Sequence, residues 1–243
     1  GWGGRYTCAR RPSVLSDAHL TMDGLRSWFE YLSERTDLVF TALGETMVYV
    51  VTVTIAAGLL AVVVGVSTRH RPFSKELSLA IASVFLTIPS LALFTIFIPL
   101  VGLGFVPSFI ALFLYAILPI LRNTTSGLDS VDPSVLESAR GMGMTPRQTL
   151  WHVQLPLAWP IMLAGIRVSA MLTVGISAIA TLVAGGGLGD FIKSGLARLP
   201  LPNSLEAIWT GVILSVLLAL AIDIALLLLG RFTTPAGIRG KSA

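Results

Sequence analysis

The chain has 243 residues and a formal net charge of +4, and it is 54% hydrophobic and only 12% charged. Soluble domains carry about 25% charged residues, so this composition excludes an ordinary soluble protein. Residues 77–121 contain no Asp, Glu, Lys or Arg. One helix of that length, at about 1.5 Å per residue, would far exceed the ~30 Å lipid core. The sequence therefore predicts an all-α, polytopic membrane protein whose chain folds back within this apolar stretch.

The first 37 residues differ in character from the rest. Residues 1–21 fit neither a span nor a signal peptide, because no apolar core follows their basic residues. We expect them to form a disordered or non-native tail, with Met22 as an alternative start. Residues 22–37 place apolar side chains at the spacing i, i+3, i+4, i+7, namely Leu25, Trp28, Phe29 and Leu32. This pattern predicts an amphipathic helix, which is either a membrane-surface anchor or a packing helix.

Five apolar stretches within residues 38–234 are each long enough to cross a membrane. They are Thr46–Val66, Leu77–Val101, Pro107–Thr125, Leu157–Val183 and Ala207–Gly230. Only two ionisable residues, Arg167 and Asp223, fall well inside them. Counted from the same membrane face the two lie at similar depth, so they are a candidate intramembrane ion pair. The alternative is that Arg167 extends to the headgroups while Asp223 faces water.

Lysine and arginine residues near the spans predict the orientation, because cytoplasmic loops carry more of them. One side holds nine: Arg69, Arg71, Lys75, Arg122, Arg140, Arg147, Arg231, Arg239 and Lys241. The other side holds seven: Arg5, Arg10, Arg11, Arg26, Arg35, Lys193 and Arg198. We therefore expect the N-terminus outside the cell and residues 235–243 as a cytoplasmic tail.

Glycine-rich stretches give no sign of a nucleotide site. Four glycines at the outer end of the fourth predicted span are candidates for a gate or hinge, with a plain connecting loop as the alternative: Gly185, Gly186, Gly187 and Gly189. The C-terminal "GIRGKSA" lacks the first glycine of a P-loop, since Pro235 stands there. The histidines lack metal-ligand spacing, and no catalytic constellation stands out. The sequence thus gives no reason to expect catalytic residues, a metal or a cofactor in this chain.

Residues 131–157 form a polar module between two apolar blocks. Asp132 and Pro133 predict the start of a short helix, and Gly141 and Gly143 predict its end. A second segment begins at Thr145 and Pro146, and we expect Pro156 to end it before the next span. Two short capped helices on the cytoplasmic side would need a partner to cover their apolar residues. The alternative is an interfacial loop that packs on its own spans.

The spacing of this module resembles the EAA loop of ABC importer permeases. That loop reads Glu-Ala-Ala, three residues, Gly, nine residues, Ile, one residue and Leu-Pro. The matching residues here are Glu137, Ser138, Ala139, Gly143, Val153, Leu155 and Pro156. Ser138 and Val153 are small departures, from Ala and Ile. The resemblance implies that these residues couple the chain to a separate ATPase, and it implies a five-span, methionine-importer-like type I permease core.

A longer resemblance covers about residues 40–230. The runs beginning "TIPSLALFTIFIPL" and "LPLAWPIMLAGIRV" are similar to permease subunits for glycine betaine, carnitine and choline. This implies a multi-pass subunit of the bacterial inner membrane that forms the translocation path for an osmoprotectant. The implied partners are cytoplasmic ATPase subunits carrying ATP and Mg²⁺, a second permease subunit (identical or paralogous), an external solute-binding protein and the lipid bilayer, with no nucleic acid.

Other functions stay open. A permease of an amino-acid or methionine-type ABC importer would share the EAA loop. A secondary transporter would more often show internal repeats and further ionisable groups inside its spans. A membrane-anchored scaffold would transport nothing. Aromatic residues of the membrane part suit cation–π contacts with a quaternary ammonium, but packing or lipid contact is their more ordinary role. They are Tyr49, Phe85, Phe94, Phe97, Phe105, Phe109, Phe113 and Tyr115. The sequence names no substrate-binding residue.

Overall fold

A computed structural model describes residues 22–233, which contain helices and turns but no strand. Four helical stretches are long and apolar enough to span a membrane: α2 (Thr36–Thr68), α5 (Phe105–Asp129), the stretch Pro146–Val183 and α10 (Ser204–Thr233). Helices α3 (Pro72–Thr87) and α4 (Ser90–Val101) meet this test only together, and they are bent by 95°. The predicted all-α fold with about five spans is therefore confirmed, with the bent pair as the fifth.

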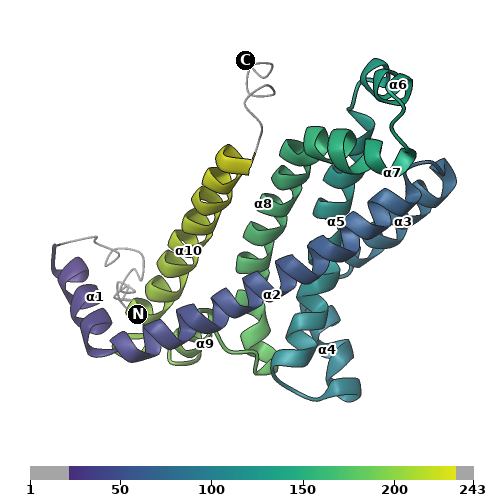
Figure 1. Cartoon of the computed structure of the whole chain (residues 1–243). Helices are drawn as coiled ribbons and strands as arrows, with labels where there is room; N and C mark the ends of the chain where they lie inside the picture. Colours follow the sequence, from purple (N-terminus) through teal and green to yellow (C-terminus); the bar gives the residue numbers. More distant parts are fainter. Residues whose placement is uncertain (1–21, 234–243) are drawn as a thin grey trace, which may run out of the picture.

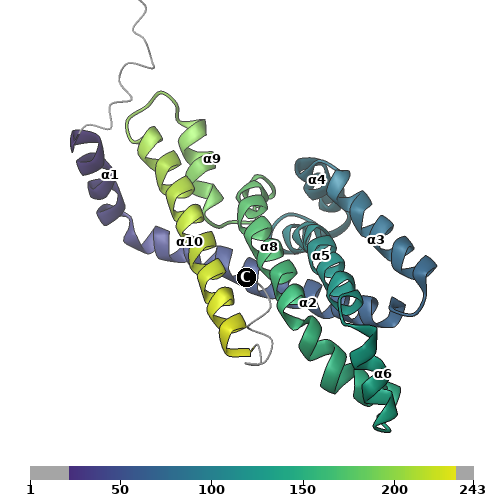
Figure 2. The same cartoon turned by 90° about the horizontal axis from the view of Figure 1, so that it is seen from above.

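Shorter elements connect these helices. They are α1 (Met22–Glu34), α6 (Pro133–Gly141), α7 (Pro146–Thr149), the π-helical turn η1 (Leu150–Gln154), α8 (Leu155–Ala180), the 3₁₀ turn η2 (Thr181–Val183) and α9 (Gly189–Ala197). Helices α6 and α7 lie at one end of the molecule, and α1 and α9 lie at the other (Figure 1). Seen end-on, α5 lies between α8 and the α3–α4 pair, while α10, α9 and α1 lie on the other side of α8 (Figure 2).

Helix α5 is the centre of the packing. Small residues let α8 and α2 approach it closely: a Cβ on Gly165 of α8 would lie 2.7 Å from the Pro119 carbonyl oxygen, and one on Gly65 of α2 would lie 2.7 Å from Thr124 Cγ2. Close approach of this kind is how membrane helices gain packing without a hydrophobic driving force. The Ser169 hydroxyl also donates to the Ala116 carbonyl at 3.0 Å, across the α8–α5 contact.

The predicted span Leu77–Val101 is wrong as a single helix. The chain breaks at Ile88, whose ψ of 130° is extended, because the residue before a proline is pushed out of the helical region. Pro89 also has no N–H to continue the helix. The Tyr115 hydroxyl of α5 donates to the freed Ile88 carbonyl, so the break leaves no unpaired acceptor there. Helices α3 and α4 therefore form a bent pair against α5.

The first span is longer than predicted. Helix α2 begins at Thr36 rather than Thr46 and has 33 residues. At 1.5 Å per residue it measures about 50 Å. Glu45 consequently lies within α2, just before the predicted span Thr46–Val66.

Helix α1 matches the expected amphipathic segment, although its contacts differ in detail. Trp28 Nε1 donates to the Thr210 hydroxyl of α10 at 3.0 Å, and Tyr31 is buried against α2, α9 and α10. Phe29, assigned to the apolar face, is 61% exposed. The Leu25 side chain, the 1–21 tail and residues 234–243 lie outside the described residues.

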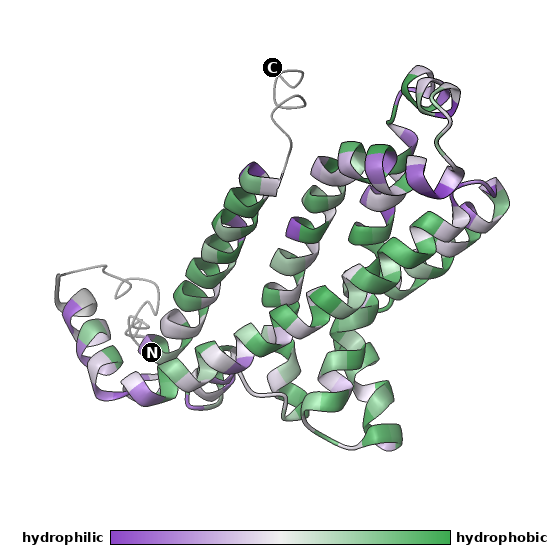
Figure 3. Cartoon of the chain, viewed as in Figure 1, coloured by the Kyte–Doolittle hydropathy of each residue, from purple (hydrophilic) through white to green (hydrophobic). Residues whose placement is uncertain are grey.

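The surface of the spans is apolar, whereas the α6–α7 end is polar (Figure 3). Of the counted basic residues that the structure describes, seven belong to the α6 side: Arg69, Arg71, Lys75, Arg122, Arg140, Arg147 and Arg231. Four belong to the α9 side: Arg26, Arg35, Lys193 and Arg198. The excess favours α6 in the cytoplasm, as predicted from the sequence.

Two cysteine variants test this orientation. In a Cys8→Ser background, the exposed positions Met142 near α6 and Ala197 in α9 are each replaced by cysteine. A membrane-impermeant thiol reagent should label Ala197→Cys in intact cells, and it should label Met142→Cys only after the cells are opened. The reverse pattern would invert the topology.

Candidate functional site

Helix α6 carries the residues that match the EAA loop, and its start is fixed by a local cap. The Asp132 carboxylate accepts a hydrogen bond from the Ser134 N–H at 2.8 Å, and Pro133 occupies the first helical position. Proline suits this position because its N–H would have no partner there and its φ is already helical. The helix is therefore set at a defined angle where it leaves α5.

The end of α6 is a left-handed glycine turn. Gly143 has φ +83°, its N–H donates to the Arg140 carbonyl at 2.9 Å, and the Met144 N–H donates to the Ala139 carbonyl at 3.1 Å. This pair of bonds is the Schellman arrangement, which satisfies the last carbonyls of a helix. No neighbouring atom lies near the place of a Cβ on Gly143, so the backbone conformation alone requires glycine.

The residues of the matching pattern divide into two groups. Glu137, Ser138 and Gly143 are exposed on α6 and its end, whereas Ala139 is buried. The other three are half-buried where the chain enters the membrane: Val153, Leu155 and Pro156. Leu155 packs on an apolar cluster with Leu150, Leu128 and Met162. One group thus offers a free surface for a partner, and the other ties the module to α5 and α8.

The second segment does not end at Pro156, contrary to the sequence prediction. Thr145 and Gln148 form a capping box that starts α7, and the chain then runs through the π turn η1 into α8. Pro156 lies in the first turn of α8, where a proline needs no N–H partner from within that helix. Residues Pro146–Val183 consequently form one 38-residue helical stretch from the α6 side to the opposite side of the membrane.

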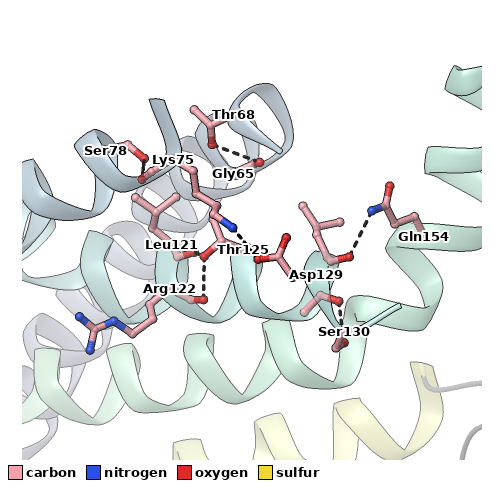
Figure 4. Close-up of polar contacts among 12 residues, drawn as sticks. Gly65, Thr68, Lys75, Ser78, Leu121, Arg122, Thr125, Asp129, Ser130 and Gln154 are labelled. Carbon is pink, nitrogen blue, oxygen red and sulfur yellow. Dashed lines mark hydrogen bonds and ion pairs between the residues drawn. The ribbon is translucent and has the colours of Figure 1, made fainter. Parts of the chain in front are cut away.

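Two polar contacts hold this module to the rest of the bundle (Figure 4). Lys75 Nζ lies 2.7 Å from Asp129 Oδ2, which joins α3 to the last residue of α5. Gln154 Nε2 donates to the Leu128 carbonyl at 3.2 Å, which joins η1 to the same end of α5. The first contact fixes the end of α5 from which the module starts, and the second attaches the end of the module to α5.

Arg167 of α8 and Asp223 of α10 are brought together inside the spans. Arg167 Nε donates to Asp223 Oδ1 and Arg167 Nη2 donates to Asp223 Oδ2, each at 2.8 Å. Such a fork-to-fork contact is strong and fixes the relative orientation of the two groups. It links α8 to α10, and it gives each charge a partner in a region where an unpaired charge is costly.

The glycine-rich stretch after η2 is held by hydrogen bonds to α2. The Gly187 N–H donates to Glu45 Oε2 at 2.7 Å, and the Leu188 N–H donates to the Thr46 hydroxyl at 3.0 Å. The Tyr49 hydroxyl donates to the Gly185 carbonyl at 2.6 Å. Gly186 and Gly187 have φ of +74° and +95°, and Gly189 packs closely on α8. Any gating movement of this stretch would therefore have to break contacts with α2.

A carboxylate next to this stretch is electrostatically perturbed. Burial raises the pKa of the Asp190 carboxyl at the start of α9, and the nearby Glu45 carboxylate raises it further, while Lys193 partly opposes both effects. Lys193 Nζ also donates to the Thr181 carbonyl at the end of α8 at 2.9 Å. The Asp190 and Glu45 carboxylates thus lie close enough to interact at this end of the molecule.

A cleft opens beside the glycine stretch. It has a volume of about 530 Å³, and its lining includes Phe40, Glu45, Tyr49, Phe105, Ala184 and Gly185. Sequence reasoning missed Glu45, because the predicted span began at Thr46, the residue after it, whereas α2 begins at Thr36. The signal was present: Glu45 precedes Tyr49 by one helical turn, and Phe105, Phe109 and Phe113 recur every four residues. Among the described residues, no group of three His, Cys, Asp or Glu could hold a metal ion.

The fold and this module define an all-helical, multi-span membrane transport subunit with an exposed, capped helix between two spans. Residues 40–234 match the family described as "Binding-protein-dependent transport system inner membrane component". The chain belongs to this family and is an inner-membrane transport permease.

Two relatives of known role and one solved structure are similar to this chain. The chain is 42% identical over 181 residues to the choline transport system permease protein OpuBB of Bacillus subtilis (strain 168), covering 74% of this chain and 82% of that one. It is 39% identical over 193 residues to the glycine betaine/carnitine/choline transport system permease protein OpuCB of the same organism, covering 79% and 87%. A solved inward-facing structure of the MetNI methionine ABC transporter is similar with a TM-score of 0.71 and 25% identity, covering 83% of this chain and 99% of that one.

A double-mutant cycle tests whether Arg167 and Asp223 stabilise the bundle as a pair. Arg167→Ala and Asp223→Ala should each lower the thermal stability of the detergent-purified protein, because each leaves its partner charge without a counter-charge. The double variant should lose less than the sum of the two single losses. Thr233→Val is the matched control, because it breaks another α8–α10 contact, the 2.7 Å bond from Trp159 Nε1, without unpairing a charge. Strictly additive losses would contradict the pair.

Proposed function

We propose that this chain is the membrane-spanning subunit of an ATP-driven importer for a quaternary ammonium osmoprotectant such as choline, glycine betaine or carnitine. The observation that carries this proposal is α6, a short exposed helix that is capped at both ends and leads into η1, which is hydrogen-bonded to the end of α5. The two osmoprotectant permeases are 42% and 39% identical to this chain, whereas the methionine transporter is 25% identical. The substrate assignment therefore follows the osmoprotectant permeases.

Coupling begins at the exposed face of α6. A separate cytoplasmic ATPase binds Glu137, Ser138 and the turn at Gly143, because these residues are exposed while Ala139 packs inward. The ATPase supplies ATP and Mg²⁺, and this chain supplies a rigid attachment for it. When the ATPase subunits close on ATP, they displace α6 and bias the permease between two conformations.

The displacement travels along α8. Since α7, η1 and α8 are continuous, a movement of α6 and α7 tilts one rod that reaches the glycine stretch on the far side. Arg167 and Asp223 make α10 move with that rod. The glycine stretch then acts as the outer gate, and its bonds to Glu45, Thr46 and Tyr49 hold it closed in the conformation described here.

The translocation path lies between this chain and a second permease subunit, and an external solute-binding protein delivers the substrate to the α9 side. Few residues of α10 are buried within this chain, so its apolar side chains form a surface that faces lipid or another subunit.

Uptake into membrane vesicles tests the proposal. The chain is co-expressed with the ATPase and binding protein that co-purify with it in mild detergent. Labelled choline or glycine betaine should accumulate only with ATP and binding protein present, and it should still do so after proton and sodium gradients are collapsed. Uptake that follows an ion gradient without ATP would identify a secondary transporter. Equal uptake of methionine would overturn the substrate assignment.

A pair of glycine variants tests coupling through α6. Gly143→Ala forces a side chain into a left-handed conformation, at a local cost of roughly 1–2 kcal/mol, and should abolish most ATP-dependent uptake while leaving membrane insertion normal. Gly141→Ala is the matched control, because it is two residues away, has equally open surroundings and has no positive φ. It should transport normally. Normal transport by Gly143→Ala with its ATPase bound would contradict coupling through this turn.

A further inference from the structure

We propose that the cleft beside the glycine stretch is a binding site for a quaternary ammonium cation, formed by the carboxylate of Glu45 and the exposed aromatic side chains of Phe40 and Phe105. This inference rests on the proposed function, and it adds a site within the permease itself. The volume of about 530 Å³ is within the roughly 300–1,000 Å³ typical of small-molecule sites.

The aromatic side chains are the first observation. Tyr49 of α2 and Phe105 of α5 are stacked, with ring centroids 4.8 Å apart and an interplanar angle of 17°. Phe105 continues to Phe109 at 5.9 Å, and Phe109 continues to Phe113 at 6.1 Å. The cleft thus sits at one end of a column of four roughly parallel rings. Phe40 adds a further ring at the rim, where it is 72% exposed.

The carboxylate is the second observation. Glu45 is exposed and lines the cleft one turn before Tyr49 on α2. The Tyr49 side chain itself is only 1% exposed and packs behind Phe105. Its Oε2 accepts the Gly187 N–H at 2.7 Å, which fixes the side chain at the cleft wall. The charge of Asp190 lies close enough to interact with Glu45. A quaternary ammonium is weakly hydrated and cannot donate hydrogen bonds, so ring faces plus a nearby negative charge are the contacts that suit it.

The same charge sets a preference among ligands. Choline and tetramethylammonium carry only a positive charge, so Glu45 attracts them and repels no part of them. Glycine betaine carries its own carboxylate a few atoms from the ammonium group, and this carboxylate is repelled by Glu45. The site should therefore bind choline more tightly than glycine betaine.

The location gives the site a role in transport. The cleft is lined by Ala184 and Gly185 as well as by α2 and α5, so it borders the stretch assigned above as the outer gate. A cation held there would contact both α2 and the end of the α8 rod. The site is thus placed to receive substrate on the α9 side before the path opens inward.

Binding to the full-length chain in detergent tests the site without any partner subunit. The probes are choline, tetramethylammonium, glycine betaine and 3,3-dimethylbutan-1-ol, which has the shape of choline but no charge. Isothermal titration should show choline and tetramethylammonium binding more tightly than glycine betaine, and the neutral alcohol binding most weakly. Equal binding of choline and the neutral alcohol would show a generic apolar cleft and overturn the proposal.

Three variants localise the binding. Glu45→Gln keeps an oxygen for the Gly187 N–H but removes the charge, and it should weaken choline binding roughly tenfold without changing binding of the neutral alcohol. Phe105→Leu should weaken choline by a similar factor, roughly tenfold. Phe113→Leu is the matched control, since it removes a ring of the same column two steps away from Phe105, and it should bind normally. Thermal unfolding checks that all three are folded.

The outcomes separate this site from the proposed function. If folded Glu45→Gln and Phe105→Leu proteins bind choline as the unaltered chain does, the site is wrong, while ATP-dependent osmoprotectant uptake in vesicles leaves the proposed function intact. If the unaltered chain binds choline as described but vesicles show no ATP-dependent uptake of osmoprotectants, the proposed function is wrong and the site stands.

Discussion

Backbone hydrogen bonding in an apolar medium is the constraint on which the rest of this structure depends. A helix can break inside lipid only where another group satisfies the freed N–H and C=O groups. At the α3–α4 break, the Tyr115 hydroxyl caps the Ile88 carbonyl. At the glycine stretch, Glu45 and Thr46 accept backbone N–H groups, and Tyr49 donates to a carbonyl. Polar side chains within the spans thus decide where the chain is allowed to bend.

The same requirement acts in the module of α6 and α7 with different means. Outside lipid, local caps suffice: Asp132 starts α6, the Gly143 turn ends it, and the Thr145–Gln148 capping box starts α7. Because these caps act within a few residues, α6 is short and stiff without needing a core of its own. A stiff element that follows α5 and leads into a turn bonded to the end of α5 suits the transmission of a displacement better than a flexible loop would.

The helices themselves were predictable because lipid imposes length and apolarity on each span. The caps of α6 were also predictable, since Asp132, Pro133 and Gly143 act through neighbouring backbone groups that sequence order alone defines. Contacts between segments that are distant in the chain were not predictable. The continuity of α7 with α8 through Pro156 involves a π turn and the contact of Gln154 with Leu128, and the Ile88 carbonyl freed by Pro89 is capped by Tyr115, 27 residues away. The local sequence of those segments does not indicate which distant residues they contact.

The polar residues of the spans were only partly predictable for the same reason. Arg167 and Asp223 stood out because each is alone in an apolar run, and similar depth was enough to suggest that they meet. Glu45 did not stand out, because it lies at the edge of an apolar run whose helical start cannot be read from hydropathy. Its importance follows from two features of the folded chain. Its carboxylate bonds to Gly187, 142 residues away, and it lines a cleft whose residues come from α2, α5 and the stretch after η2.

Glu45 joins two tasks that would otherwise be separate. Its carboxylate accepts the Gly187 N–H, which fixes the glycine stretch against α2, and the same carboxylate lines the cleft. A cation in the cleft and the backbone N–H therefore draw on one negative charge, so the hold on the stretch differs between the empty and the occupied cleft. A ligand shifts a conformational equilibrium only through such a difference in interaction between states. The glycine stretch follows α8 through η2, and the opposite end of that helical stretch leads back to α6. One side chain thus connects the cleft, the glycine stretch and the end of the long helical stretch through a single set of contacts.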